Sequence, residues 1–140
     1  MIQAKNIHKY YNDLHVLKGV EIHVKKSEVV SIVGASGAGK TTLLQILGTL
    51  DQASKKEDSQ LIINDIDINA LNEKGLAKFR NEHIGFIFQF HHLLPDFTAL
   101  ENVMIPGLIA GKTKKEMIEP AKELLDQVEL GHRGHHKVGE

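Results

Sequence analysis

The chain has 140 residues, of which 41% are hydrophobic and 25% are charged, a composition typical of a soluble globular domain with one modest core. A formal net charge of −1 leaves no excess of basic residues for nucleic acid, and the absence of cysteine excludes disulfides and thiolate metal sites. No apolar run reaches the length of a membrane span, and the first residues lack the apolar segment of a signal peptide, so we expect a cytoplasmic setting.

Three segments in the first part of the chain are expected to be β-strands. Residues 2–7 form a short β-prone run, and residues 20–24 alternate between apolar and polar side chains, as a half-buried strand does. Residues 29–33 (VVSIV) are apolar on both faces, which is typical of a strand buried in a parallel sheet. We therefore predict a small antiparallel β-subdomain that leads into the central strand of an α/β core.

A glycine-rich loop follows that central strand directly. Its residues are Gly34, Ala35, Ser36, Gly37, Ala38 and Gly39, followed by Lys40, Thr41 and Thr42. Residues 43–50 carry leucine and isoleucine at helical spacing, so the loop lies between a strand and a helix. This order of elements predicts a phosphate-binding loop of the P-loop type.

Each residue type in this loop has a physical reason to be there. Glycines allow backbone N–H groups to turn inward around phosphate oxygens, and the start of a helix adds unpaired N–H groups and the positive end of its dipole. We expect Lys40 to reach the β- and γ-phosphates, the Thr41 hydroxyl to bind Mg²⁺, and Thr42 to contact a phosphate nearer the ribose. The loop therefore predicts a site for a nucleoside triphosphate and magnesium.

Tyr11 precedes the loop, in a segment (residues 10–13) that we expect to be a turn. Its ring could stack on adenine, a contact worth about 1–3 kcal/mol in base-binding sites. The residues alone also allow an ordinary surface tyrosine, so both interpretations stay open at this point.

The middle of the chain is expected to hold a hairpin and a helix. Residues 61–63 (LII) and 66–68 (IDI) are short β-prone segments separated by Asn64 and Asp65, a pair typical of a turn. We prefer this turn to a strand-end aspartate that supports Mg²⁺. Asn72 is a suitable N-cap for a short helix after it.

Residues 84–88 (IGFIF) predict a second strand of the core, and Gln89 follows it immediately. Ligands of open α/β sheets bind at the carboxyl ends of strands, where a glutamine could offer its carbonyl to Mg²⁺ and its amide to water. Gln89 could also simply cap the strand, and its position alone does not decide between these two roles.

Two capping boxes predict helices in the last third of the chain, one at residues 98–101 (TALE) and one at residues 113–116 (TKKE). We expect the first helix to stop near residues 106–107 (PG), because proline removes a hydrogen bond inside a helix. Pro120 is expected to kink the second helix or to lie in the first turn of a new one.

Together these motifs resemble those of the ATP-binding subunit of an ABC transporter. The similarity rests on the loop at residues 34–42, on Tyr11 as an adenine-stacking aromatic, and on residues 86–89 (FIFQ) as the strand that leads into the Q-loop of that family. Residues 1–7 and 94–103 are similar to segments of its lipoprotein-releasing, macrolide-exporter and cell-division group. The resemblance covers essentially the whole chain.

The resemblance implies a P-loop NTPase core of the α/β class, with an antiparallel β-subdomain and the start of an α-helical subdomain. It assigns residues 1–90 to the β-subdomain and nucleotide-binding core, and residues 91–140 to the Q-loop exit and the beginning of the helical subdomain. Lys40 and Gln89 are implied as catalytic residues, Thr41 and Gln89 as metal ligands, and ATP and Mg²⁺ as the bound groups.

The resemblance also implies how the protein works. The family couples ATP binding and hydrolysis to transport by integral membrane subunits, with a homodimer of the ATP-binding subunit on the inner face of the cell membrane. The 140 residues contain no LSGGQ-like signature, no strand-end Asp-Glu pair and no switch histidine. We therefore expect a truncated ABC ATPase domain that binds ATP without hydrolysing it, and no nucleic-acid partner.

Two alternatives come from other classes of protein. A small kinase or GTPase would use a similar loop, but it would need an acceptor-binding lid or an Asn-Lys-x-Asp segment that reads guanine, and no such segment occurs in the sequence. A nucleotide-independent interaction module would keep the fold alone, and the intact pair Lys40 and Thr41 argues against it.

Overall fold

The computed structural model describes residues 1–54, 58–90 and 92–140. Its contacts divide the chain into two compact units, Met1–Arg80 and Asn81–Glu140, and each is described by itself. This boundary falls earlier than the predicted one after residue 90, and the predicted division of function stays a prediction. No helix in the described residues is both long enough and apolar enough to cross a membrane.

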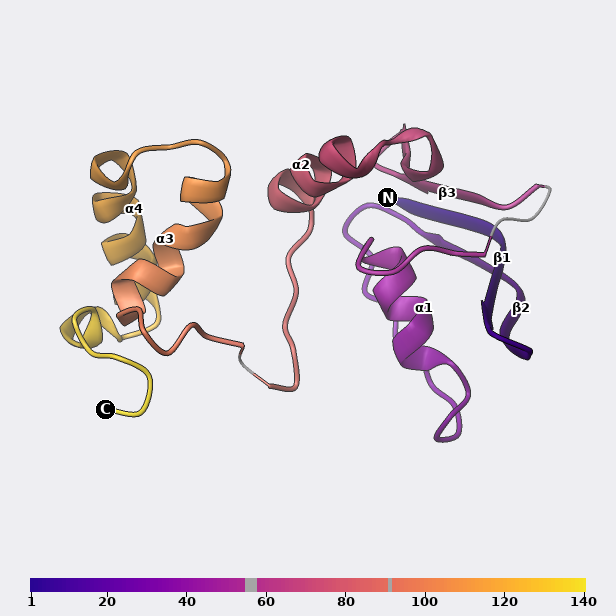
Figure 1. Cartoon of the computed structure of the whole chain (residues 1–140), viewed down its shortest axis with the longest axis horizontal. Coiled ribbons are helices and arrows are strands. Elements are labelled where there is room, and N and C mark those ends of the chain that lie inside the picture. The colour runs from indigo at the N-terminus through magenta and orange to yellow at the C-terminus, as the bar shows by residue number, and fades with distance from the viewer. Residues whose placement is uncertain (55–57, 91) are drawn as a thin grey trace. The chain divides into compact units, whose positions relative to one another are not determined.

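The first unit contains a four-stranded antiparallel sheet with the strand order β2-β1-β3-β4, of which Figure 1 labels β1, β2 and β3. Its strands are β1 (Ile2–Tyr11), β2 (Leu14–Val24), β3 (Gln60–Ile63) and β4 (Ile66–Asp67). The predicted antiparallel β-subdomain is confirmed, although β1 runs through Tyr11 and the turn holds only Asn12 and Asp13. The turn predicted between the two later strands is also confirmed, since Asn64 and Asp65 both have a positive φ.

Helix α1 (Lys40–Leu47) packs against β1 and β2. It buries the apolar stripe predicted from the sequence, which consists of Leu43, Ile46 and Leu47. From the sheet, the fully buried Ile7 and the buried Leu17 add to this core. Burial of one large aliphatic side chain stabilises a fold by about 1.5–3 kcal/mol, so these residues fix α1 on the sheet.

A 3-10 turn, η1 (Ile68–Ala70), and helix α2 (Glu73–His83) follow β4 along the chain. The side chain of Asn72 accepts a hydrogen bond from the Gly75 N–H at 2.8 Å, which confirms the predicted N-cap. Arg80 Nη1 donates to the Thr49 carbonyl at 2.7 Å and ties α2 to the end of α1.

Residues 29–33 do not form the predicted central strand. No strand in the described residues pairs with them, and Val29 and Val33 are 97% and 84% exposed. A strand inside a parallel sheet needs neighbouring strands, whereas the strands of this unit pair only with one another. The prediction of a buried strand is therefore wrong for this structure, although the segment still leads straight into the glycine-rich loop.

The second unit is built around two helices, α3 (Ala99–Ile109) and α4 (Lys114–Gln127), with a 3-10 turn, η2 (Gly131–Arg133), after them. Both predicted capping boxes are confirmed, because each N-cap threonine and its glutamate three residues later bond to each other's backbone N–H. Met104, Met117 and Ala121 are buried between the helices. A Cβ added at Gly107 would overlap Met117 Sδ, so the Met117 side chain of α4 lies directly against α3 at this point.

Two predictions for the second unit are wrong. Residues 84–88 form no strand and Ile87 is fully exposed, because no described strand offers them a partner. Helix α3 does not stop near residue 106 but includes Pro106, since the close packing of Gly107 against Met117 holds this turn on α4. Of the two outcomes predicted for Pro120, the start of a new helix does not occur, because Pro120 lies within the single helix α4.

Candidate nucleotide-binding site

The loop that leads into α1 has a backbone that glycine adopts most readily at two positions. Gly37 and Gly39 have φ angles of 78° and 88°, in the left-handed region. A Cβ added at Gly39 would also lie only 2.9 Å from Leu17 Cδ2 and 3.1 Å from Val16 Cγ1 of β2. Glycine at position 39 therefore allows the loop to pass close to β2 before it enters the helix.

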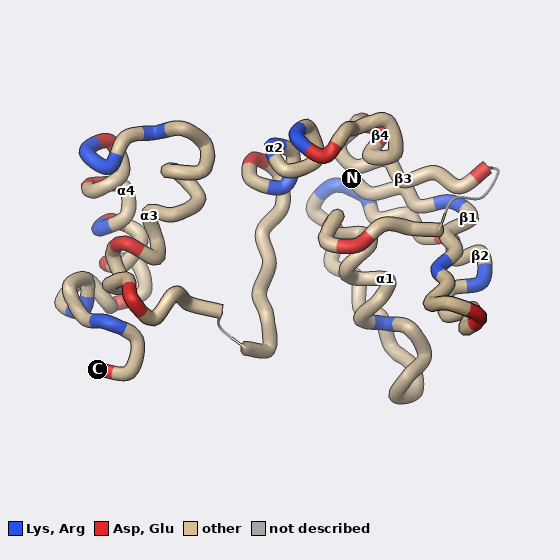
Figure 2. Tube along the Cα trace, in the orientation of Figure 1, with Lys and Arg blue, Asp and Glu red and all other residues tan. Residues whose placement is uncertain are grey.

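The first turn of α1 has no built-in partner for its N–H groups. Gly39 is the N-cap and offers no side chain, Lys40 is the first helical residue, and the turn contains no acid. Figure 2 shows one basic segment at the start of α1 and no acidic segment on the loop before it. The free N–H groups and the positive end of the helix dipole make this turn a binding site for an anion such as phosphate.

The Lys40 ammonium is held beside the loop by backbone carbonyls. Its Nζ donates hydrogen bonds to Gly34 O at 2.9 Å and to Ala35 O at 2.7 Å. An ammonium has three donors, so one remains for an oxygen atom of a ligand. The uncapped first turn of α1 and Lys40 thus place positive charge on one short segment.

The predicted phosphate-binding residues lie in one continuous segment. Gly34, Ser36, Gly37 and Ala38 are in the exposed loop, and Thr41 and Thr42 are in the first turn of α1. Gln89 lies in the second unit, in a bend after residues 84–88. A joint magnesium site of Thr41 and Gln89 therefore stays a prediction.

Tyr11 is the last residue of β1 and is 45% exposed. Its hydroxyl donates a hydrogen bond to Asp51 Oδ2 at 3.1 Å, and Lys9 Nζ lies 5.1 Å from the centroid of its ring. A cation over the face of a tyrosine is a stabilising contact. The ring is therefore held at its hydroxyl end and over one face.

Lys9 and Asp51 are candidates that the sequence analysis missed. Lys9 could have been found, because side chains two residues apart on a strand share a face and Lys9 precedes Tyr11 by two. Asp51 gave no signal, because it lies 40 residues from Tyr11 and only the fold brings them together.

The environment of Asp51 keeps its carboxyl ionised. Burial raises the pKa of this carboxyl, but the hydrogen bonds from Lys9, from the Gln52 N–H and from Tyr11, with the Lys9 charge, lower it by more. The pKa of Asp51 therefore lies below its ordinary value of 3.8, and the group is a carboxylate at neutral pH.

Comparison with known families decides the wider assignment. The family model described as ABC transporter matches residues 17–140. The chain belongs to the ABC transporter family. The family predicted from the sequence is confirmed, and the alternatives from other classes are not favoured.

Curated ABC transporter proteins similar to this chain are ATP-binding proteins by name. The lipoprotein-releasing system ATP-binding protein LolD of Porphyromonas gingivalis is 56% identical over 140 residues, and that of Bacteroides fragilis is 52% identical over 140 residues. Each match covers 100% of this chain and 63% of the relative. The chain therefore spans less than two thirds of the length of these relatives.

Solved ABC transporter structures share the fold. A dimeric post-hydrolysis structure of the ATP-binding cassette MJ0796 bound to ADP and Pi is 36% identical, with a TM-score of 0.85 over 99% of this chain and 62% of that one. A dimeric structure of MJ0796, a bacterial ABC transporter cassette, is 37% identical with a TM-score of 0.84, over 98% of this chain and 61% of that one. The predicted fold class, an α/β ABC ATPase domain with an antiparallel β-subdomain, is confirmed.

Proposed function

We propose that this chain binds ATP and Mg²⁺ through the loop at residues 34–42. The observation that carries the proposal is the way the glycine-rich loop leads into α1. The loop has positive φ angles at Gly37 and Gly39, and the first turn of α1 begins with Lys40 and has neither a side-chain cap nor an acidic residue. Backbone N–H groups and an ammonium complement a triphosphate both in charge and in hydrogen bonding. Magnesium, when bound, supplies further positive charge to the phosphates.

The roles of single residues follow the family resemblance. The amides of the loop surround the phosphates, and they belong to Gly34, Ser36, Gly37, Ala38 and Gly39. Lys40 contacts the β- and γ-phosphates, and Thr42 contacts a phosphate nearer the ribose. Thr41 and Gln89 bind Mg²⁺, and Tyr11 stacks on adenine.

For the whole protein we propose an ATPase that drives transport or extraction by integral membrane subunits. The name of the LolD relatives supports lipoprotein release as the process, and the dimeric MJ0796 structures support a homodimer. Such a protein would lie in the cytoplasm, attached to the inner face of the membrane through the transporter subunits. We propose that these 140 residues supply the nucleotide-binding part, because they contain the loop at residues 34–42, and the signature, the Asp-Glu pair and the switch histidine do not occur in them.

Calorimetric titration of the chain with MgATP tests the binding proposal. Lys40→Ala is expected to raise the Kd about tenfold or more, because a charge-assisted hydrogen bond contributes about 1.5–3 kcal/mol. Lys26→Ala, which removes an exposed lysine before the loop, is the matched control and is expected to leave the Kd unchanged. Equal binding by the native chain and Lys40→Ala would refute the proposal.

Release of inorganic phosphate from MgATP tests the division between binding and hydrolysis. The native chain is expected to release no more phosphate than Lys40→Ala does. Turnover that depends on Lys40 would show that these 140 residues contain a complete hydrolytic site.

A further inference from the structure

Lys9 and Asp51, here called the Tyr11 bracket, hold Tyr11 by two different contacts. Asp51 Oδ2 accepts the Tyr11 hydroxyl at 3.1 Å, and Asp51 Oδ1 accepts Lys9 Nζ at 2.6 Å. Lys9 Nζ also donates to Gln52 O at 2.8 Å, and it lies 5.1 Å from the centroid of the Tyr11 ring. The side chains of Lys9 and Asp51 are 12% and 29% exposed, so water competes less for the bond between them than for the exposed bond from the Tyr11 hydroxyl.

The segment that carries Asp51 is fastened to the end of β1. Ser54 N donates to His8 O at 2.8 Å, and Tyr10 N donates to Ser54 Oγ at 3.0 Å. At its other end the segment leaves α1, where Asp51 N donates to Gln45 O at 3.2 Å. Hydrogen bonds thus connect the strand end that holds Tyr11 with the helix that starts at the phosphate loop.

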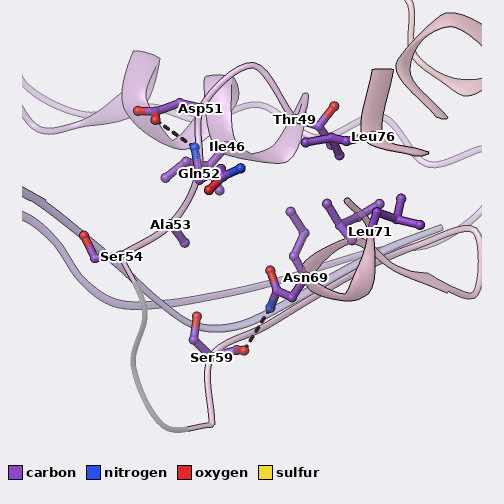
Figure 3. Close-up of a pocket in the computed structure, with 12 residues that line it drawn as sticks. Ile46, Thr49, Asp51, Gln52, Ala53, Ser54, Ser59, Asn69, Leu71 and Leu76 are labelled. Carbon is purple, nitrogen blue, oxygen red and sulfur yellow. Dashed lines mark hydrogen bonds between the residues drawn. The ribbon is translucent and has the colours of Figure 1, made fainter. Parts of the chain in front are cut away.

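Packing alone does not fix Asp51 in this place. Residues 49 and 51–54 line a pocket of about 510 Å³, which Asn69 and Leu71 also line (Figure 3). Figure 3 shows the hydrogen bond from Gln52 N to Asp51 Oδ1, at 2.7 Å. Because empty space adjoins this segment, its hydrogen bonds to β1, together with the bond from Asp51 N to Gln45 O of α1, help to hold the Asp51 carboxylate against Tyr11.

We propose that the Tyr11 bracket positions the Tyr11 ring with one face open to the base of the nucleotide, and so sets the share of affinity that comes from the base. This inference rests on the proposed function, in which Tyr11 stacks on adenine. Lys9 lies over one face of the ring and the residue is 45% exposed, so we place the base on the face opposite Lys9. A ring ordered before binding loses less entropy when the base stacks on it. Asp51 and Lys9 are therefore positioning residues that do not themselves touch the ligand.

The negative charge of Asp51 makes it possible to distinguish a positioning role from a direct electrostatic effect on the ligand. ATP is an anion, so a carboxylate near its site opposes binding, and its removal by itself would strengthen binding. Positioning predicts the opposite result, a loss of affinity when Asp51 is removed. Asp13, an exposed acid in the turn after Tyr11, is the matched control for charge.

The test compares the Kd of MgATP with that of magnesium tripolyphosphate, which offers the phosphates without a base, for the chain and its variants. Asp51→Ala and Tyr11→Phe each remove one partner of the hydroxyl bond and are expected to weaken MgATP about two- to tenfold, with tripolyphosphate unchanged. Their losses are expected to be non-additive, because both act on the same bond. Lys9→Met is expected to weaken MgATP selectively as well, whereas Asp13→Ala is expected to leave both constants unchanged.

Three results would overturn the inference, and they are distinguishable from one another. Equal losses for MgATP and tripolyphosphate in Asp51→Ala would give Asp51 a structural role only. Unchanged MgATP binding in Asp51→Ala and Tyr11→Phe, together with a loss in Tyr11→Ala, would reject the bracket and leave the proposed function intact. Unchanged MgATP binding in Tyr11→Ala would reject Tyr11 as the stacking residue, and with it the bracket, while Lys40-dependent binding would still support the phosphate loop.

Discussion

Residues 20–24 and 29–33 are both rich in β-branched residues, yet only the first segment is a strand. Residues 20–24 lie in β2 and pair with β1, where Val20 is opposite Ile7 and Ile22 is opposite Ala4. Residues 29–33 have the more apolar sequence but form no regular secondary structure and are mostly exposed, without a partner strand in the described residues. Apolar character therefore marks a segment that can enter a sheet, and the partner decides whether it does.

The two segments differ in where a partner can be found. β1 and β2 are joined by the two-residue turn Asn12 and Asp13, so their pairing is local and closing the loop costs little entropy. A parallel strand needs a crossover connection and a partner far along the chain. Residues 84–88, like residues 29–33, have no partner strand in the described part of the chain, and both segments keep large apolar side chains at the surface.

Shortening one isoleucine in each kind of segment would test this comparison with the largest effect. Ile7→Ala, at a fully buried position in β1, is expected to lower the free energy of unfolding by about 2–5 kcal/mol. Ile87→Ala removes the same atoms from a fully exposed residue and is expected to change the free energy of unfolding by less than about 0.5 kcal/mol. Denaturant unfolding followed by circular dichroism measures both, and equal losses would contradict the difference in partnering.

A pair of glycine substitutions sharpens the same contrast. Gly39→Ala places a Cβ against β2 at a positive φ and is expected to cost about 1–3 kcal/mol of stability. Gly85→Ala places a Cβ where no atom lies within 4 Å and is expected to be neutral or to stabilise by about 0.4–1 kcal/mol. Thermal unfolding midpoints of the two variants provide the measurement, and a Gly39→Ala chain as stable as the native one would be the contrary result.

The capping boxes extend the comparison to helices, whose hydrogen-bond partners are local. Thr113→Ala removes the side-chain oxygen that accepts the Glu116 N–H and is expected to cost about 1 kcal/mol. Thr113→Ser keeps that oxygen and serves as the control, with stability close to that of the native chain. A loss of the same size in both variants, measured by denaturant unfolding, would mean that the methyl group and not the cap is responsible.

The smallest expected effect is a pH dependence of the α3 cap. Bonds from the Thr98 N–H, from Lys114 and from the Thr98 hydroxyl lower the pKa of Glu101 below its ordinary value of 4.5. A lowered pKa in the folded state contributes stability above pH 4.5, and this contribution is lost as the pH falls through the lower folded value. Helical circular dichroism on acidification measures it, and Glu101→Gln is expected to show a smaller change over that interval.

The sequence predicts the features that are set by neighbouring residues and misses those set by distant ones. The phosphate loop and the capping boxes need only a few adjacent residues, and the structure contains the caps as predicted. The bond between Tyr11 and Asp51 depends on how α1 ends beside β1, which no local pattern reports. Pro106 is a case in which the local signal is misleading. The proline predicts a helix end, but α3 continues through it to Ile109, and the helix packs against α4.

The close approach of Gly107 to Met117 has a consequence for how this helix pair can change. A methyl group at position 107 would overlap the end of the Met117 side chain, which would have to turn away. Because a methionine side chain is flexible, this adjustment costs less than a shift of the backbone would. The methionine therefore gives the helix pair some tolerance at position 107 that a rigid side chain at 117 would remove.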